Sequence, residues 1–342
     1  VYGCGNNKYG QLSNKYNQQN NGIQCIFNTN NIKYIDCCNY SSYMINNDNK
    51  LLSFGDNGCG QLGINKKFQN IDDLMKHDFF NENINIQLIS NSISAQHCFV
   101  YTKKGQLYGF GNDVCGQIGS REFNVYEPCL IEYNFGASLK QIKSGVYHTL
   151  FLCDNGDVYG CGRNAEGQLT KGYKNIRPKC IIQKIIDTHN IENIGCCVNS
   201  SYILSKDNIL SAFGNNYNGE LGIKDFHTKY CSTIKVIMKQ IKTFDCGELH
   251  IGCLTLNNKL YMYGYNEYYQ CGLKKGHSCH NGNAIILPND IIMVDIKCGA
   301  YHNIIKTNDN WYGFGCNDNN QLLIHDSIQY EIDIATKISL EY

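Results

Sequence analysis

The chain has 342 residues, long enough for one large domain or two ordinary ones, and its apolar fraction of 42% is enough for a sizeable core. Thirty basic and thirty acidic residues give a formal net charge of zero, which argues against a nucleic-acid surface, because binding driven by counterion release needs a basic face. Apolar runs are short pieces such as 284–287 and 291–294, well below the roughly 18 residues of a membrane-spanning helix.

Cysteine usage bears on the compartment and on metal binding. The chain has 20 cysteines, and its two adjacent pairs, Cys37–Cys38 and Cys196–Cys197, are poor candidates for internal disulfides. No Cys-x-x-Cys spacing occurs, and the nearest approach to a metal cluster is His277, Cys279 and His280. Ligands so close together in one loop cannot easily complete a tetrahedral site. We therefore expect reduced thiols, no metal site and no cofactor, in an intracellular protein of the cytoplasm or nucleus.

A repeated phrase dominates the chain and begins at its first residue. Residues 1–13 read VYGCGNNKYGQLS, and the same pattern returns six more times. The later copies are LLSFGDNGCGQLG (51–63), LYGFGNDVCGQIG (107–119), VYGCGRNAEGQLT (158–170), LSAFGNNYNGELG (210–222), LYMYGYNEYYQCG (260–272) and WYGFGCNDNNQLL (311–323). The glycine at the fifth position of each copy serves as a marker and falls at positions 5, 55, 111, 162, 214, 264 and 315. These positions give a period near 51 residues, which identifies a repeat architecture.

A second phrase precedes each of the last six copies. In the fourth repeat it reads IKSGVYHTLFLCDNGDVYGCG (142–162), in which Gly-x-x-His joins two apolar runs. The pair recurs at Gly247 and His250 and at Gly299 and His302, whereas the third repeat has Ser94 before His97. The second and fifth repeats have Cys and Ser at the two positions, 38 and 41 and 197 and 200.

Each repeat therefore contains short runs of β-branched and aromatic residues bounded by glycine and asparagine, which is typical of strands and hairpins. About four antiparallel strands per repeat, repeated seven times, is typical of the blades of a β-propeller. We predict an all-β fold, a seven-bladed propeller that forms a single domain over residues 1–342.

The paired phrases Gly-x-x-His and (Trp/Phe)-Gly-x-Asn-x-x-Gly-Gln-Leu-Gly resemble the regulator of chromosome condensation repeat over essentially the whole chain. The resemblance implies a seven-bladed propeller. It also implies two possible functions. One is a protein–protein interaction platform, as the propeller module of a larger, multidomain protein. The other is a guanine-nucleotide exchange factor for a Ran-like small GTPase.

The Gly-Gln-Leu-Gly turn has a structural interpretation, because its glutamine can hydrogen-bond buried turn amides while the next residue supplies core. These glutamines are Gln11, Gln61, Gln117, Gln168 and Gln321. The fifth repeat has Glu220 instead, the sixth has Tyr269 in place of the first glycine, and the seventh has Asn320 there. We interpret these departures as drift in structural turns; Asn tolerates positive φ better than most residues.

The first repeat has no Gly-x-x-His phrase before it, although a ring needs its last blade closed to avoid open edges. The C-terminal stretch ATKISLEY (335–342) matches the strand that normally precedes such a phrase. We expect the given chain to be a fragment whose parent continues past Tyr342 with roughly 20 to 30 residues of the form IxxIxxGxxHxLxL. Within residues 1–342, the ring can then contain one incompletely closed blade.

The longest repeat spacing leaves an extra loop over residues 64–84. Apolar residues fall there near helical spacing, which predicts a short helix lying on the propeller; the alternative is a projection that contacts a partner, favoured if Phe79 and Phe80 are exposed. The residues of this candidate interaction loop are Phe68, Ile71, Leu74, Met75, Phe79 and Phe80.

The four histidines of the Gly-x-x-His phrases suggest catalysis at first sight. Because they are equivalent in successive blades, they should be separated by blade-sized distances, and the favoured interpretation is a hydrogen bond to the neighbouring turn. The recurring Gly-x-Gly lacks the strand-to-helix context of a nucleotide loop, and no Gly-x-Ser-x-Gly or His-Glu-x-x-His signature occurs. We therefore assign no catalytic residues and expect no enzyme acting on small molecules.

We favour the interaction platform over the exchange factor, because the third repeat has no wedge-sized insertion and the basic tail of the resembling exchanger is absent. A protein partner is expected, with no membrane and no direct nucleic-acid binding, and the propeller should be monomeric. The Gly-x-x-His turns should cluster on one rim of the ring. The candidate partner-binding face consists of His97, His148, Glu248, His250, Tyr301 and His302.

Overall fold

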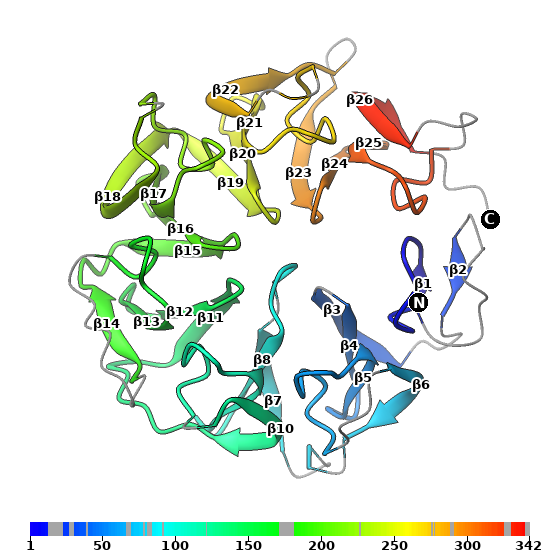
Figure 1. Ribbon diagram of the computed structural model, residues 1–342, viewed down its shortest axis with the longest axis vertical. Helices are drawn as coiled ribbons and strands as arrows, with labels where there is room; N and C mark the ends of the chain where they lie inside the picture. The colour runs from blue at the N-terminus through cyan, green and yellow to red at the C-terminus, as the bar shows by residue number, and fades with distance from the viewer. Residues whose placement is uncertain are drawn as a thin grey trace.

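The structure is a computed structural model that describes residues 1–12, 23–26, 31–38, 40–65, 70–77, 79–80, 84–90, 92–120, 122–170, 181–225, 227–274, 276, 278–287, 291–324 and 330–338. These residues form β-strands and turns, arranged as a ring of separate antiparallel sheets (Figure 1). None of them is helical, so the described chain offers no helix that could cross a membrane.

Six of the sheets are four-stranded blades, which we number by the repeat that supplies them. Blade 2 consists of β3 (Ile32–Cys38), β4 (Ser41–Asn46), β5 (Leu51–Asp56) and β6 (Asn70–Lys76), and blade 3 of β7 (Ile86–Ser90), β8 (His97–Thr102), β9 (Leu107–Asn112) and β10 (Asn124–Leu130). Blade 4 consists of β11 (Leu139–Ser144), β12 (His148–Cys153), β13 (Val158–Gly162) and β14 (Gln183–Ile186), and blade 5 of β15 (Ile191–Cys196), β16 (Ser200–Ser205), β17 (Ile209–Asn215) and β18 (Tyr230–Lys239). Blade 6 consists of β19 (Ile241–Cys246), β20 (His250–Thr255), β21 (Leu260–Gly264) and β22 (Cys279–Ile285), and blade 7 of β23 (Met293–Cys298), β24 (His302–Thr307), β25 (Trp311–Cys316) and β26 (Glu331–Lys337). The first strand of each blade lies nearest the middle of the ring and the fourth lies outermost (Figure 1).

The prediction of seven four-stranded blades is wrong. The described residues form six blades, and the first repeat contributes only a two-stranded sheet of β1 (Tyr2–Gly3) and β2 (Gln24–Cys25). This sheet lies between blades 7 and 2 (Figure 1) and packs against both through Cys4 and Ile26. The physical reason lies in the repeat pattern. The first repeat carries the phrase that makes a third strand but no Gly-x-x-His phrase, so it supplies no first and second strands ahead of β1.

The extra loop over residues 64–84 does not form the predicted helix. Its middle is strand β6, which completes blade 2 by pairing with β5, with Gly55 opposite Ile71 and Ser53 opposite Met75. The edge of β5 needs a partner, and this pairing satisfies its backbone groups. Leu74 also lies in β6, and Phe68 lies outside the described residues.

The two phenylalanines after β6 have different environments. Phe80 is fully buried in the core between blades 2 and 3, where its ring centroid lies 5.7 Å from that of Tyr108. Phe79 remains 41% exposed and packs edge-on against Tyr108. Of the pair that would favour a projecting partner site, only Phe79 reaches the surface.

The second strand of a blade explains why the sequence shows continuous apolar runs rather than alternation. Every residue of β8, β12 and β20 is buried, because each blade is covered on both faces by its neighbours. The hydrophobic clusters accordingly span adjacent blades: one joins Leu150 and Leu152 of blade 4 to Ile194 and Ile203 of blade 5.

The marker glycine of each repeat has two requirements that other residues fail. Gly162 has φ of 105°, and a Cβ there would lie 2.3 Å from the carbonyl oxygen of Tyr147 in the turn before the second strand. The backbone N–H of Arg163 donates to the same oxygen at 2.8 Å. The marker glycine thus brings the two turns of a blade together on one face of the ring.

Candidate protein-interaction face

One face of the ring carries two turns from every blade, and we call it the turn face. The Gly-x-x-His turns join the first and second strands, and the Gly-Gln-Leu-Gly turns follow the third. Backbone hydrogen bonds link the first kind from blade to blade: Val146 N–H donates to Val198 O at 3.1 Å, Val198 N–H to Glu248 O at 3.0 Å, and Glu248 N–H to Ala300 O at 3.2 Å. Blades 4 to 7 therefore present a continuous, backbone-bonded surface.

The histidines of this face hold neighbouring blades together. His97 Nε2 lies 2.8 Å from Thr149 Oγ1 in the next blade, and that hydroxyl donates to Gln117 O at 2.8 Å. Because the only hydroxyl proton is used in this way, His97 must donate from Nε2. Blades 4 and 5 repeat the arrangement, with His148 Nε2 2.9 Å from Ser201 Oγ, which donates to Gln168 O at 2.7 Å.

Blades 6 and 7 replace the hydroxyl by an amide. His250 Nε2 lies 2.9 Å from Asn303 Oδ1, and Asn303 Nδ2 donates to Gln270 O at 2.8 Å. Where a blade has serine in place of its histidine, at Ser41 and Ser200, the matching residue of the next blade is Cys98 or Ile251, which cannot play the hydroxyl's part. Histidine and polar partner therefore occur together across blade boundaries.

Glycine precedes the histidine because the imidazole occupies the space beside it. A Cβ at Gly145 would lie 2.2 Å from His148 Cε1, and a Cβ at Gly247 would lie 2.1 Å from His250 Cε1. Cys38 and Cys197 stand at this position in the blades whose histidine is replaced by serine, whereas the third repeat keeps its histidine with Ser94 there.

Burial removes three of the four histidines from the predicted partner-binding surface. His97, His148 and His250 have no exposed area, and their Nδ1 atoms have no hydrogen-bond partner among the described residues. Burial lowers the pKa of His97 and His148 to about 3 and that of His250 to about 4, so these side chains are neutral at physiological pH. His302 is half-buried, and burial lowers its pKa to about 4.

Glu248 and Tyr301 are the members of the predicted set that reach solvent beside the turns. Both are half-buried, and burial and then a hydrogen bond to Glu248 raise the pKa of Tyr301. The Tyr301 ring lies 5.1 Å from that of Tyr268 and 6.2 Å from that of Tyr265, measured between centroids. We call Glu248, Tyr265, Tyr268 and Tyr301 the tyrosine cluster.

The glutamines of the Gly-Gln-Leu-Gly turns organise the turn face from inside. Gln117 Oε1 accepts from Cys115 N–H at 2.9 Å, and Gln61 Oε1 accepts from Cys59 N–H at 2.9 Å. Equivalent bonds to the backbone N–H two residues earlier are made by Gln11, Gln168, Gln270 and Gln321. The substituted turns keep the same backbone form, since Tyr269 and Asn320 have φ of 61° and 54°.

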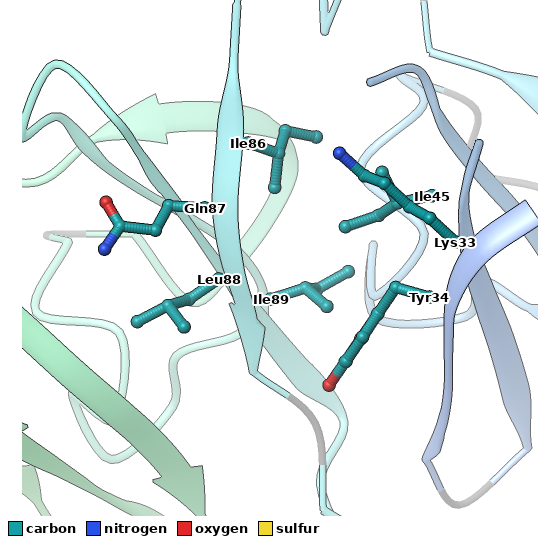
Figure 2. A pocket seen from close by; sticks show the side chains of 7 residues that line it. All are labelled: Lys33, Tyr34, Ile45, Ile86, Gln87, Leu88 and Ile89. Atoms are coloured by element: carbon teal, nitrogen blue, oxygen red, sulfur yellow. The ribbon is translucent and has the colours of Figure 1, made fainter. Parts of the chain in front are cut away.

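A cavity lies between blades 2 and 3, away from these turns. It has a volume of about 260 Å³ and is lined by Lys33, Tyr34, Ile45, Ile86, Gln87, Leu88 and Ile89. Figure 2 shows Ile86 and Ile89 pointing toward the side chains of β3, whereas Gln87 and Leu88 point to the other side of β7. The cavity is a mainly apolar gap between two first strands.

The comparisons with known proteins decide the family. The family model described as the RCC1-like domain matches residues 1–340. The chain belongs to the RCC1-like domain family. This confirms the resemblance to the regulator of chromosome condensation repeat that the two phrases carry.

Known relatives of this RCC1-like domain are distant in sequence. The human probable E3 ubiquitin-protein ligase HERC6 is 24% identical over 313 residues, which are 88% of this chain and 30% of that protein. The Arabidopsis thaliana ultraviolet-B receptor UVR8 is 25% identical over 238 residues, 68% of this chain and 54% of the receptor. The crystal structure of Prp20p from Saccharomyces cerevisiae has a TM-score of 0.84 at 16% identity, covering 99% of this chain and 85% of that one, and so shares the fold.

Sequence reasoning missed two features of this RCC1-like domain that bear on function. Tyr265 and Tyr268 come from the turn after β21 and meet Tyr301 from the next blade. The group Asp157, Asp187 and His189 assembles on the opposite face from two separate segments. The sequence signal for this group was the Asp-x-His spacing at residues 187–189. That spacing is not specific, because residues 225–227 have it too.

Replacing Glu220 by glutamine will stabilise the RCC1-like domain at alkaline pH. Glu220 is fully buried, one oxygen accepts from Asn218 N–H at 2.7 Å, and the other contacts Asn215 Nδ2. Burial raises the pKa of its carboxyl to about 7, so the unfolded chain loses this proton at lower pH than the folded one. Stability contributed below the ordinary pKa is therefore lost as pH rises through 7. We expect Glu220→Gln to raise the free energy of unfolding at pH 8 by about 2 kcal/mol.

The comparison at pH 5 is the control for Glu220→Gln, because the carboxyl is then protonated in the folded state. The gain should shrink to a few tenths of a kcal/mol at that pH, measured by urea unfolding. Equal effects of the substitution at pH 5 and pH 8 would contradict the assignment of a titrating carboxyl.

Proposed function

We propose that this chain is a protein-interaction platform that binds its partner through the turn face. The tyrosine cluster carries the proposal: three tyrosines and a carboxylate, each half-buried, lie on a surface whose turns are fixed by backbone hydrogen bonds between blades. Tyrosine is enriched in protein interfaces and among the residues that dominate binding energy. A surface that is already ordered also avoids much of the entropy cost of association.

Further aromatic residues extend this surface around the ring. The rings of Tyr9 and Tyr40 lie 4.6 Å apart, where the first repeat meets blade 2. In blade 4, Arg163 lies over the ring of Tyr147 at 5.9 Å and pairs with Glu166 at 2.7 Å. Aromatic side chains thus occur on turns of repeats 1, 2, 4, 6 and 7, as a partner spanning several blades would require.

A guanine-nucleotide exchange factor for a Ran-like small GTPase is the second candidate. The structure of Prp20p, which shares the fold, was reported together with its binding properties to Gsp1p and histones. Such an exchanger binds the nucleotide-free GTPase best and so destabilises bound nucleotide. The third repeat here has no wedge-sized insertion between β9 and β10, which is why we rank exchange second.

Capture from lysate in two buffers separates the candidates. With EDTA, an exchange factor should enrich a small GTPase and release it when magnesium and GTP are returned. An interaction platform should instead retain proteins whose binding does not respond to nucleotide. A nucleotide-sensitive GTPase in the captured fraction would reverse our ranking.

Substitutions in the tyrosine cluster test whether the turn face is the binding surface. We expect Glu248→Ala with Tyr301→Ala to weaken capture at least 10-fold, because such residues commonly contribute more than about 1.4 kcal/mol each. The matched control is Asp207→Ala with Leu256→Ala, which alters exposed residues of the β16–β17 and β20–β21 turns on the opposite face. His250 is left unchanged because its side chain holds blades 6 and 7 together. Equal capture by the cluster variant and the wild type, with unchanged thermal unfolding, would rule out this face.

A further inference from the structure

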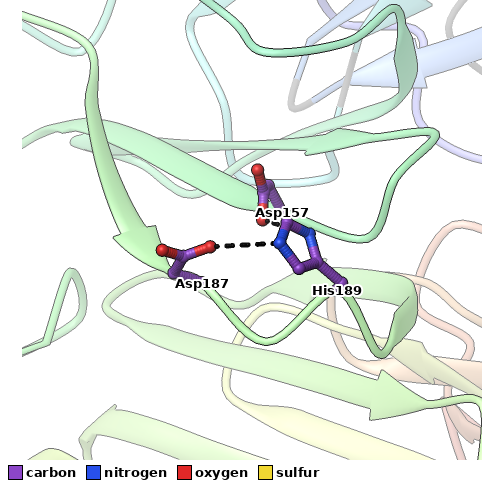
Figure 3. Close-up of side chains that lie close together, drawn as sticks. All are labelled: Asp157, Asp187 and His189. Atoms are coloured by element: carbon purple, nitrogen blue, oxygen red, sulfur yellow. Dashed lines mark ion pairs between the residues drawn. The ribbon is translucent and has the colours of Figure 1, made fainter.

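Two acidic side chains and a histidine converge on the face opposite the turn face. Asp157 lies in the turn between β12 and β13, and Asp187 and His189 lie in the connection from β14 to β15. His189 Nδ1 is 3.0 Å from Asp157 Oδ1, and His189 Nε2 is 3.6 Å from Asp187 Oδ1. Figure 3 shows the imidazole between the two carboxylates.

Asp157 has one carboxylate oxygen satisfied and one not. Its side chain is only 1% exposed. Oδ2 accepts from Lys184 Nζ at 2.8 Å and from Asn155 Nδ2 at 3.0 Å. Oδ1 accepts no hydrogen bond among the described residues, although it faces His189. A buried carboxylate oxygen that accepts no hydrogen bond is costly, and the polar atoms near this one belong to His189 and Asp187, both of which can bind a cation.

We propose that Asp157, Asp187 and His189 bind a divalent transition-metal cation of the Mn²⁺ or Zn²⁺ type. One donor atom from each residue lies within 4.8 Å of the other two. Atoms bound to one such metal at about 2.1 Å sit roughly 3 Å apart, which is the spacing of His189 Nδ1 and Asp157 Oδ1. Asp187 and His189 are each 64% exposed, so rotation of their side chains can complete the set.

The donor set selects the class of ion. Two carboxylates and one imidazole favour Mn²⁺ and Zn²⁺, whereas an all-oxygen set would favour Mg²⁺ or Ca²⁺. Three protein ligands leave the remaining positions to water. Lys184 Nζ lies 2.8 Å from Asp157 Oδ2 and 3.5 Å from Asp187 Oδ1. It can stay on Asp157 Oδ2 and orient that carboxylate, but the exposed Asp187 must turn from Lys184 to bind the metal.

The backbone holds the two segments against each other without the metal. A Cβ at Gly156, which has φ of 88°, would lie 2.6 Å from the carbonyl carbon of His189. This close approach places Asp157 beside His189, although the two residues are 32 positions apart in the sequence. Binding would join the β12–β13 turn to the β14–β15 connection and so stabilise blade 4 against blade 5.

A closed ion-pair cluster is the competing account, in which Lys184 and His189 hold the two carboxylates. That account predicts no metal binding, whereas a metal site predicts one bound ion per chain. A titration with the metal therefore separates the two accounts.

Mn²⁺ is the probe for the test, because it prefers oxygen and nitrogen donors and avoids the thiols of the 20 cysteines. Electron paramagnetic resonance measures free aqueous Mn²⁺ as it is titrated into the whole chain at pH 7.5. We expect one Mn²⁺ bound per chain. Unchanged free Mn²⁺ up to millimolar concentration would overturn the proposal.

Two variants assign the site without touching buried residues. Asp187→Asn with His189→Gln should weaken Mn²⁺ binding at least 10-fold, and it should remove the metal-dependent rise in Tm. Asp225→Asn with His227→Gln is the matched control: it has the same Asp-x-His spacing and is exposed, and it should bind Mn²⁺ as the wild type does. Binding retained by the first variant, or lost in the second, would place the metal elsewhere. Neither outcome depends on the proposed partner.

Discussion

Lowering the pH from 7.5 to 5 will destabilise the chain by about 2 kcal/mol for each histidine of the Gly-x-x-His turns. These histidines are His97, His148, His250 and His302. Burial lowers the pKa to about 3 in the first two and to about 4 in the others. Their common cause is the desolvation of the imidazole, and in the first three Nε2 already donates to the next blade.

The sign follows from which state binds more protons. Between pH 6.5 and about 4 the unfolded chain carries protonated histidines, whereas the folded chain keeps them neutral. The free energy of unfolding therefore falls as the pH drops below 6.5. Protonation in the folded state would charge Nδ1, which has no acceptor in His97, His148 or His250.

The measurement is the slope of unfolding free energy against pH. Glu220 contributes with the opposite sign, because its pKa is raised to about 7, so the titration is done in the Glu220→Gln background. His148→Gln should reduce the loss of unfolding free energy between pH 7.5 and pH 5 by about 2 kcal/mol. His227→Gln, at an exposed residue, should leave the slope unchanged. A slope unaffected by His148→Gln would contradict a buried neutral imidazole.

The periodic phrases predicted the elements that depend on local chemistry. Marker glycines such as Gly162 were recognisable because positive φ and close approach of another backbone both exclude a side chain. The glutamine turns were recognisable because their hydrogen bond is local: Gln117 accepts from Cys115, two residues away. Interactions within one turn leave a record at a fixed spacing in the sequence.

Interactions between blades leave a record that is harder to read, because the partners lie one repeat apart. His148 and Ser201 meet across 53 positions, and their pairing is recognised only once the blades are seen side by side. The helix predicted over 64–84 failed for another reason. The pairing of β5 with β6 shifts register between Ser53 and Gly55, and the sequence of such an irregular strand need not show a period of two.

The number of blades depends on both phrases rather than on the marker phrase alone. Seven marker phrases suggested seven blades, but a four-stranded blade also needs the Gly-x-x-His phrase for its first two strands. That second phrase occurs six times, counting its variant forms at 38–41, 94–97 and 197–200, and the described residues form six blades. The phrase that joins the inner strands therefore sets the number of complete blades.

Gly162→Ala will lower the free energy of unfolding by about 4 kcal/mol or more, because two costs coincide. A φ of 105° is unfavourable for any residue with a side chain. The added Cβ would also lie 2.3 Å from Tyr147 O and 2.9 Å from His148 Cα. Relieving that overlap displaces the turn on which His148 is held, and so weakens the contact with blade 5.

Gly105→Ala separates the two costs. Gly105 has φ of 76°, but a Cβ there would come no closer than 3.6 Å to another atom, the Tyr133 hydroxyl oxygen. The control therefore bears only the backbone cost, about 1 kcal/mol. Midpoints of thermal and urea unfolding should rank wild type above Gly105→Ala and Gly105→Ala far above Gly162→Ala. If both variants lose the same stability, close approach of the two turns does not explain the marker glycine, and positive φ alone does.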